Sequence, residues 1–120
     1  MQVKGWIDAR DDCRADGFDL VTIESAAENA FVFGLLSAAA WIGFNDLDSE
    51  GAFVWSDGSP SEYTNWFRDE PNNGDGRNQD CAIINYPGDG GDYPPYGEQW
   101  DDTECNPPAE YVCALKINPY

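Results

Sequence analysis

Apolar residues recur at helical spacing near the start of the chain. Trp6, Ala9 and Cys13 lie three or four residues apart, and the turn-forming residues 15–17 end the pattern. A helix near residues 4–15 would place these side chains on one face. The spacing therefore predicts a first helix there.

A second helix is predicted after a short extended segment at residues 20–23. Ser25 and Glu28 match a capping box, in which each side chain binds the other residue's free backbone donor. An apolar run follows to about Leu36. We expect the inward face of this helix to carry Ala27, Phe31 and Leu35.

Short runs of apolar and aromatic residues predict strands in the remainder of the chain. These runs are residues 41–44, 52–55, 82–84, 99–101 and 111–115. Turn-forming residues fill the segments 57–81 and 87–97, and the first of these is longer than a compact domain usually tolerates without a function. Two helices followed by short antiparallel strands indicate an α+β fold, in one domain over residues 1–120.

Charge and composition exclude several classes of partner. The 120 residues are 42% hydrophobic, which is enough for a core, and carry a net charge of −17. This charge argues against nucleic acid and anionic membranes as partners. The longest apolar stretch, around residues 30–36, is too short for membrane insertion. No signal peptide is recognisable, so we expect a mature chain or one excised from a longer precursor.

Four cysteines and the absence of histidine favour two disulfides over a zinc site, because no close cysteine pair is present. Disulfides imply an oxidising compartment, so we expect a secreted or cell-surface protein.

Carboxylates and amides crowd two segments that are distant in sequence. Glu70-Pro71-Asn72 opens the region and Trp100-Asp101-Asp102 closes it. Ca²⁺ prefers six to eight oxygen ligands of these kinds. Cys81 and Cys105, one in each segment, could hold the segments together as a disulfide. The region is therefore predicted to be a calcium site whose ion binds something else.

The order of short motifs along nearly the whole chain resembles the C-type lectin-like domain. The motifs are Trp6-Ile7-Asp8-Ala9-Arg10 with Cys13, Leu20-Val21-Thr22-Ile23 with Ser25 and Glu28-Asn29, Trp41-Ile42-Gly43-Phe44, Glu50-Gly51, Phe53-Val54-Trp55-Ser56-Asp57-Gly58, Tyr63 with Asn65-Trp66, Glu70-Pro71-Asn72, Cys81, Trp100-Asp101-Asp102, Cys105 and Tyr111-Val112-Cys113. The resemblance implies that fold, with disulfides Cys13–Cys113 and Cys81–Cys105. Trp41 and Trp55 are expected in the core, and Trp100 is expected to anchor the strand that carries Asp101 and Asp102.

The resemblance also implies calcium-dependent carbohydrate binding without enzymatic activity. Carried over by position, the primary Ca²⁺ ligands are Glu70, Asn72, Gln79, Asp101 and Asp102. Two neighbouring sugar hydroxyls would complete the ion's shell and contact Glu70, Asn72 and Asp101. In the family, Glu-Pro-Asn accompanies mannose, glucose, N-acetylglucosamine and fucose, so the expected partner is a mannose-type glycan.

Two positions depart from the family pattern in a reciprocal way. Gln79 stands where the family has an acid, and Asp101 stands where it has an amide. The ligand charge is kept, but a hydrogen-bond donor and an acceptor exchange places around one hydroxyl. The monosaccharide preference is therefore left open.

Further residues are assigned around the primary site. An auxiliary Ca²⁺ site of the family maps onto Asp46, Glu50, Asn73 and Asp80. Tyr93 and Tyr96, in the long segment 87–97, are candidates for stacking on a sugar ring, and a solvated loop is the alternative. Only residues 1–5 precede Trp6, so the family's first strand is expected to be short or missing. An uncovered edge on the closing strand would favour an oligomer or attachment within a larger extracellular protein.

Three alternative interpretations remain. Residues 46–57 approach an EF-hand loop, but strand-like residues follow where a helix is needed. A carboxylate pair could serve a glycoside hydrolase, but no pair stands out. The last alternative keeps the fold and replaces sugar binding by protein, ice or surface binding.

Overall fold

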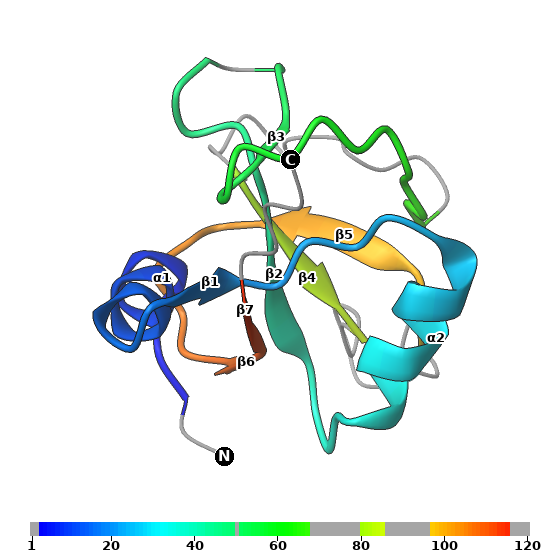
Figure 1. Cartoon of the computed structure of the whole chain (residues 1–120), viewed down its shortest axis with the longest axis horizontal. Coiled ribbons are helices and arrows are strands. Elements are labelled where there is room, and N and C mark those ends of the chain that lie inside the picture. The colour runs from blue at the N-terminus through cyan, green and yellow to red at the C-terminus, as the bar shows by residue number, and fades with distance from the viewer. Residues whose placement is uncertain (1–2, 50, 68–79, 86–96, 116–120) are drawn as a thin grey trace.

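The computed structural model describes residues 3–49, 51–67, 80–85 and 97–115. Two helices and seven strands lie within this part of the chain and are labelled in Figure 1. In chain order they are α1 (Trp6–Ala15), β1 (Phe18–Leu20), α2 (Ala26–Gly34), β2 (Ala40–Asn45), β3 (Val54–Trp55), β4 (Cys81–Ile84), β5 (Trp100–Thr103), β6 (Glu110–Tyr111) and β7 (Cys113–Leu115). The predicted α+β class is confirmed.

The strands form two sheets. The larger sheet has the order β3-β2-β4-β5 with antiparallel neighbours, and β6 pairs with β2 in parallel. The smaller sheet pairs β1 with β7. Figure 1 shows α1 and α2 at opposite sides of the molecule, with β2, β4 and β5 running between them. One apolar cluster lies between the larger sheet and α2, and the other lies between that sheet and α1.

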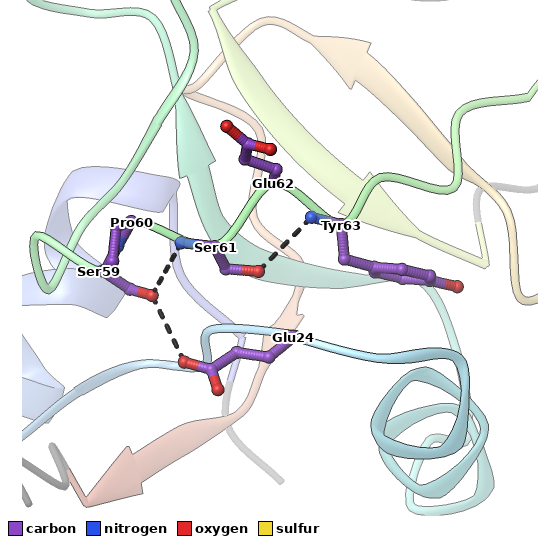
Figure 2. A pocket seen from close by; sticks show the side chains of 6 residues that line it. All are labelled: Glu24, Ser59, Pro60, Ser61, Glu62 and Tyr63. Carbon is purple, nitrogen blue, oxygen red and sulfur yellow. Dashed lines mark hydrogen bonds between the residues drawn. The ribbon is translucent and has the colours of Figure 1, made fainter.

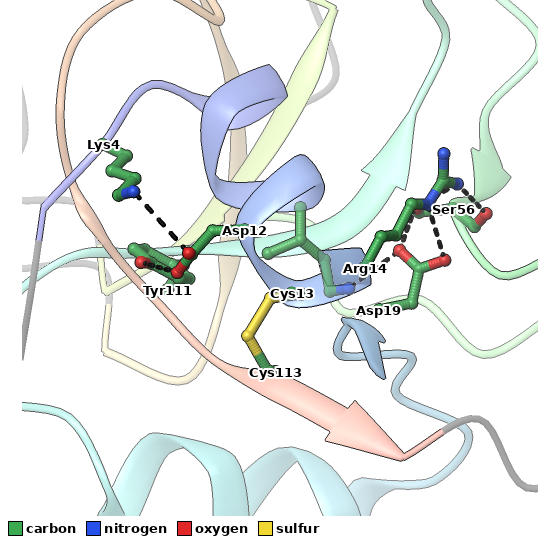
Figure 3. The surroundings of a disulfide bond; sticks show 9 residues. Lys4, Asp12, Cys13, Arg14, Asp19, Ser56, Tyr111 and Cys113 are labelled. Carbon is green, nitrogen blue, oxygen red and sulfur yellow. Dashed lines mark hydrogen bonds and ion pairs between the residues drawn. A yellow bond between two sulfur atoms is a disulfide. The ribbon is translucent and has the colours of Figure 1, made fainter. Parts of the chain in front are cut away.

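Helix α1 buries the face that its sequence predicts. Trp6, Ala9 and Cys13 are buried, and Cys13 is bonded to Cys113 in β7. Hydrogen bonds flank this disulfide on either side (Figure 3). Tyr111 donates to Asp12 at 2.5 Å. The chain ends are thus tied together across a sequence separation of 100 residues.

The other side of the same disulfide carries a buried acid with two side-chain partners. Asp19 lies in β1 and is 7% exposed. Its carboxylate accepts hydrogen bonds from Arg14 Nε at 3.1 Å and from the Ser56 hydroxyl (Figure 3). Arg14 also donates to the Ser56 carbonyl at 3.0 Å. These contacts connect α1 and β1 to the end of β3.

A glycine lets β1 and β2 approach closely. A Cβ at Gly43 would lie 3.1 Å from the carbonyl oxygens of Leu20 and Val21, closer than side chains normally allow. The Gly43 backbone uses this proximity, because its N–H donates to Val21 O and its carbonyl accepts from Ser56 N, both at 2.9 Å. The Trp-Ile-Gly motif therefore holds the smaller sheet against the larger one.

The N-terminus of α2 departs slightly from the predicted capping box. Ser25 Oγ accepts from Glu28 N at 3.1 Å, as expected. The Glu28 side chain, however, accepts from the backbone N–H of Glu24 at 2.8 Å rather than from Ser25. Each side chain still satisfies a free backbone donor at the helix start.

The predicted inward face of α2 is wrong. Ala27 is exposed, and Phe31 and Leu35 are 69% and 49% exposed. The buried residues are Asn29 and Val32 instead. Because the helix is apolar on nearly all sides, its periodicity cannot distinguish the face that packs on the sheet.

Two neighbouring substitutions test this orientation. Phe31→Ser should change the free energy of unfolding by less than about 0.5 kcal/mol, since the ring already lies in solvent. Val32→Ala should cost about 2 kcal/mol, because Val32 is 4% exposed and its truncation leaves a cavity. Urea titration of the two variants measures both values. Equal losses would contradict the observed orientation.

The prediction of a single closing strand at residues 111–115 is also wrong. Residues 110–111 pair with β2, whereas residues 113–115 pair with β1 in the other sheet. Val112 lies at the change, where its carbonyl accepts from Val21 N at 2.9 Å. The predicted strand at residues 52–55 is shortened to β3, and the extended segment predicted at 20–23 begins earlier, at Phe18. Before α1, Lys4 forms an isolated bridge with Ala109.

Candidate functional site

Trp100 positions the two acids that follow it. It is fully buried, and its indole makes edge-on contacts with Trp55, Tyr63 and Trp66 at centroid distances of 5.7–5.9 Å. The predicted core positions of Trp41 and Trp55 and the anchoring position of Trp100 are confirmed. An anchored ring at the start of β5 fixes where the next residues of that strand begin.

Asp101 and Asp102 continue β5 beside β4. Their ladder partners are Ile83 and Ala82, and both acids are buried, at 6% and 1% exposure. Burial first, and the Asp102 carboxylate second, raise the pKa of Asp101 from 3.8 to about 7. The charge of Asp102 disfavours ionisation of the buried Asp101, so a cation near the pair would be stabilised.

Asp101 also has an unsatisfied oxygen. Its Oδ1 atom is buried and has no hydrogen-bond partner in the described part of the chain. Buried polar atoms normally find a partner, since the cost of leaving one unpaired is about 1–3 kcal/mol. A metal ligand is one of the few roles in which such an atom gains a partner on binding.

Asp46 shows the same feature at the end of β2. It is 2% exposed, and its Oδ1 is buried without a hydrogen-bond partner among the described residues. Its Oδ2 accepts from Gly51 N at 2.8 Å. The Asp46 N–H donates to the carbonyl of Asp80 at 2.9 Å, which joins the two described residues predicted for the auxiliary site.

The second disulfide lies beside these acids. Cys81 follows Asp80 at the start of β4, and Cys105 follows β5 by two residues. The bond between them is formed as predicted, across a sequence separation of 24 residues. It connects the strand that starts next to Asp80 with the strand that carries Asp101 and Asp102.

The remaining predicted ligands lie outside the described residues. They are Glu50, Glu70, Asn72, Asn73, Gln79, Tyr93 and Tyr96. Within the described ranges, no three acidic side chains converge on one point. The acids that are described fit a hard cation by their chemistry, because each contributes carboxylate oxygens and Asp46 and Asp101 each have a buried oxygen without a hydrogen-bond partner among the described residues.

An open hollow lies at residues 59–63. It has a volume of about 320 Å³ and is lined by Glu24, Ser59, Pro60, Ser61, Glu62 and Tyr63 (Figure 2). Its polar groups largely bond to each other: Ser59 Oγ donates to Glu24, and Ser61 N donates to Ser59 Oγ. Burial raises the pKa of Tyr63, and the nearby charge of Glu98 adds to this.

Sequence reasoning missed the amides that hold the segment before Asp101. Asn29 and Asn65 both donate to the carbonyl of Glu98, at 2.8 and 2.9 Å. The sequence signal for Asn29 is an amide within a mostly apolar helix, because a polar residue is retained inside a core only where it is hydrogen-bonded.

The profile of the Lectin C-type domain family matches residues 2–115, which is nearly the whole chain. The chain belongs to the C-type lectin domain family. Domains of this family are non-enzymatic and bind carbohydrate, so the expectation that the chain is no enzyme is confirmed.

Lectin BRA-3 of Megabalanus rosa is 40% identical to this C-type lectin domain over 115 residues, which are 93% of the chain. The chain spans 65% of that lectin's length. The curated relatives include lectins and receptors. Neither described helix is long and apolar enough to cross a membrane.

Solved structures with the same fold differ in what their titles describe. The carbohydrate-recognition domain of cow CD23, crystallised in the presence of a GlcNAc2Man3 oligosaccharide, aligns with a TM-score of 0.78 and 32% identity. That alignment covers 92% of this chain and 79% of the CD23 domain. Herring type II antifreeze protein aligns with a TM-score of 0.79 and 27% identity, over 93% of this chain and 83% of that one.

Proposed function

We propose that this C-type lectin domain binds glycans of the mannose type through a Ca²⁺ ion held by Glu70, Asn72, Gln79, Asp101 and Asp102. The observation that carries the proposal is the buried pair Asp101–Asp102, in which one carboxylate oxygen lacks a partner. The match of the chain to the Lectin C-type domain family supports the same assignment.

The chain's own groups would orient the sugar. A bound Ca²⁺ ion supplies coordination positions that two neighbouring hydroxyls can fill. Carboxylates such as Asp101 accept hydrogen bonds from these hydroxyls, and amides such as Asn72 donate to them. The direction of each bond depends on which side chain is acid and which is amide, so the exchange at Gln79 and Asp101 would alter the preferred sugar.

We further propose an auxiliary Ca²⁺ site at Asp46, Glu50, Asn73 and Asp80. The unpartnered Oδ1 of Asp46 and the bond from Asp46 N to Asp80 O support it. Such an ion would stiffen the segment between Asn73 and Asp80 and thereby Gln79. We also place Tyr93 and Tyr96 near the sugar, on the basis of sequence position alone.

The setting we propose is extracellular. The two disulfides form in oxidising compartments, and the acidic chain is unsuited to anionic membranes. A secreted or cell-surface location, as a free domain or within a larger protein, agrees with these properties.

A glycan array tests the sugar proposal. We expect the fluorescently labelled chain to bind mannose-type glycans in millimolar Ca²⁺ and to lose that binding in EDTA. Glu70→Gln combined with Asn72→Asp should weaken mannose-type binding, because two positions exchange donor and acceptor character. Asp57→Asn is the control at an acid outside both predicted sites. Full retention of mannose binding by the double variant would place the sugar elsewhere.

The likeness to a herring antifreeze protein favours ice binding as the second candidate. An ice-binding chain would show thermal hysteresis and reshape growing ice crystals. Thermal hysteresis with no glycan retained on the array would replace the sugar proposal by this one.

A further inference from the structure

Asn29 is an amide buried in an otherwise apolar part of the molecule. It lies on α2, is 2% exposed, and has Val32 as its buried neighbour on the helix. Both ends of its side chain are used. Nδ2 donates to the carbonyl of Glu98 at 2.8 Å, and Oδ1 accepts from Trp100 Nε1 at 2.8 Å.

These two bonds fix the segment immediately before the proposed calcium ligands. Glu98 and Trp100 flank Gln99, and Asp101 follows. The helix that carries Asn29 is about 70 residues away in sequence, with separations of 69 and 71 residues to its two partners. The contact therefore connects α2 to β5 directly.

A second amide, Asn65 in the segment after β3, holds the same residues. Asn65 Nδ2 donates to Glu98 O at 2.9 Å, and Asn65 O accepts from Trp100 N at 2.8 Å. Backbone bonds thus fix the main chain of Trp100, whereas its indole ring is oriented by Asn29. The rings around the indole, which belong to Phe44, Trp55, Tyr63 and Trp66, make ring contacts with it.

We propose that Asn29 is a positioning residue for the calcium site, and that it acts through Trp100 to hold the carboxylates of Asp101 and Asp102 in place. This inference rests on the proposed function. Calcium ligands must be held within a narrow range of distances, and bonds behind the ligands provide that precision. The two acids repel each other, so a rigid anchor at the start of β5 opposes their separation.

The geometry also distinguishes Asn29 from an ordinary core residue. A core residue such as Val32 contributes to stability by burial, and its loss is felt throughout the domain. Asn29 bonds to the two residues on either side of Gln99 at the start of β5. Its loss should change the affinity for Ca²⁺ beyond any general loss of stability.

Calorimetric titration of Ca²⁺ at pH 7.5 into the full chain tests the inference, using variants shown by circular dichroism to be folded. Asn29→Ala should raise the dissociation constant for Ca²⁺ about 10-fold or more, the scale of lost bonds behind metal ligands. Val32→Ala is the matched control on the same helix and should change it less than about 2-fold, although its melting temperature falls.

Trp100→Phe provides a second route that does not depend on Asn29→Ala being folded. It keeps an aromatic ring and removes the N–H, and it should by itself raise the dissociation constant for Ca²⁺. In the double variant, Asn29→Ala should add less than about 3-fold to the effect of Trp100→Phe, because the bond between the two side chains is already lost and only the bond from Asn29 to Glu98 remains to be removed.

The outcomes show whether the inference alone fails or the proposed function fails with it. Ca²⁺ binding by the unmodified chain with an unchanged constant in Asn29→Ala or in Trp100→Phe overturns the inference alone. Equal effects of Asn29→Ala and Val32→Ala, or full additivity in the double variant, overturn it too. Absence of Ca²⁺ binding in the unmodified chain overturns the proposed function, and the inference with it.

Discussion

Asp101→Asn should weaken calcium-dependent glycan binding and at the same time stabilise the calcium-free domain at pH 8. The variant keeps a side-chain oxygen that can coordinate Ca²⁺, as the family's amide does, but loses one negative charge, so Ca²⁺ binding should weaken about 10-fold. Glycan binding would fall with it, since the sugar is bound through the ion. Calorimetry and the glycan array measure the two losses.

The gain in stability follows from the raised pKa of Asp101. A carboxyl whose pKa is about 7 in the folded chain and 3.8 ordinarily adds stability below about pH 4 and loses it as the pH rises through 7. In EDTA the unmodified domain should therefore be less stable at pH 8 than at pH 5. Asparagine cannot ionise, so the variant should be more stable than the unmodified domain at pH 8 by more than about 1 kcal/mol.

Chemical denaturation at pH 5 and pH 8, with and without Ca²⁺, checks that the variant is more stable without the ion and less stable with it. Added Ca²⁺ should reverse the order of the two proteins at pH 8, because an ion bound only by the folded state raises the free energy of unfolding. A variant that is less stable than the unmodified domain under all four conditions would contradict the raised pKa of Asp101, and an unchanged order of the two proteins on adding Ca²⁺ would contradict its assignment as a ligand.

Opening the two disulfides in turn should rank them in one order by the loss of folding free energy and in the reverse order by the loss of calcium affinity. Cys13→Ala with Cys113→Ala opens a loop of 100 residues and should cost about 4.7 kcal/mol of folding free energy in the chain-entropy relation. Cys81→Ala with Cys105→Ala opens a loop of 24 residues and should cost about 3.5 kcal/mol.

Calcium affinity should show the reverse order. The Cys81–Cys105 bond connects β4 to the chain after β5, next to the acids, whereas Cys13–Cys113 connects α1 to β7. Denaturant titration and calorimetry on the two double variants give the comparison. A larger loss of calcium affinity on opening Cys13–Cys113 would contradict the location of the site.

The elements that sequence reasoning identified correctly are those with a local physical signal. The apolar spacing of Trp6, Ala9 and Cys13 is regular, so the buried face of α1 follows from it. Ser25 caps α2 through a bond three residues away. Asp101 and Asp102 are both buried on the strand that Trp100 anchors, and their role as calcium ligands stays a prediction.

The features that sequence reasoning missed depend on contacts between distant segments. Phe31 and Val32 are both apolar, and only the packing of α2 on the sheet decides which is buried. The division of the closing strand at Val112 depends on a bond to Val21, 91 positions earlier in the chain. Asn29 could not be assigned because its partners lie near residue 100.

A crystal structure of the domain grown with Ca²⁺ and a mannose-type sugar tests the central claim most directly. We predict an ion coordinated at about 2.3–2.6 Å by oxygens of Asp101, Asp102 and the Glu-Pro-Asn segment, with two neighbouring sugar hydroxyls on the same ion. An empty position beside Asp101 in millimolar Ca²⁺, or a sugar bound away from the ion, would contradict it.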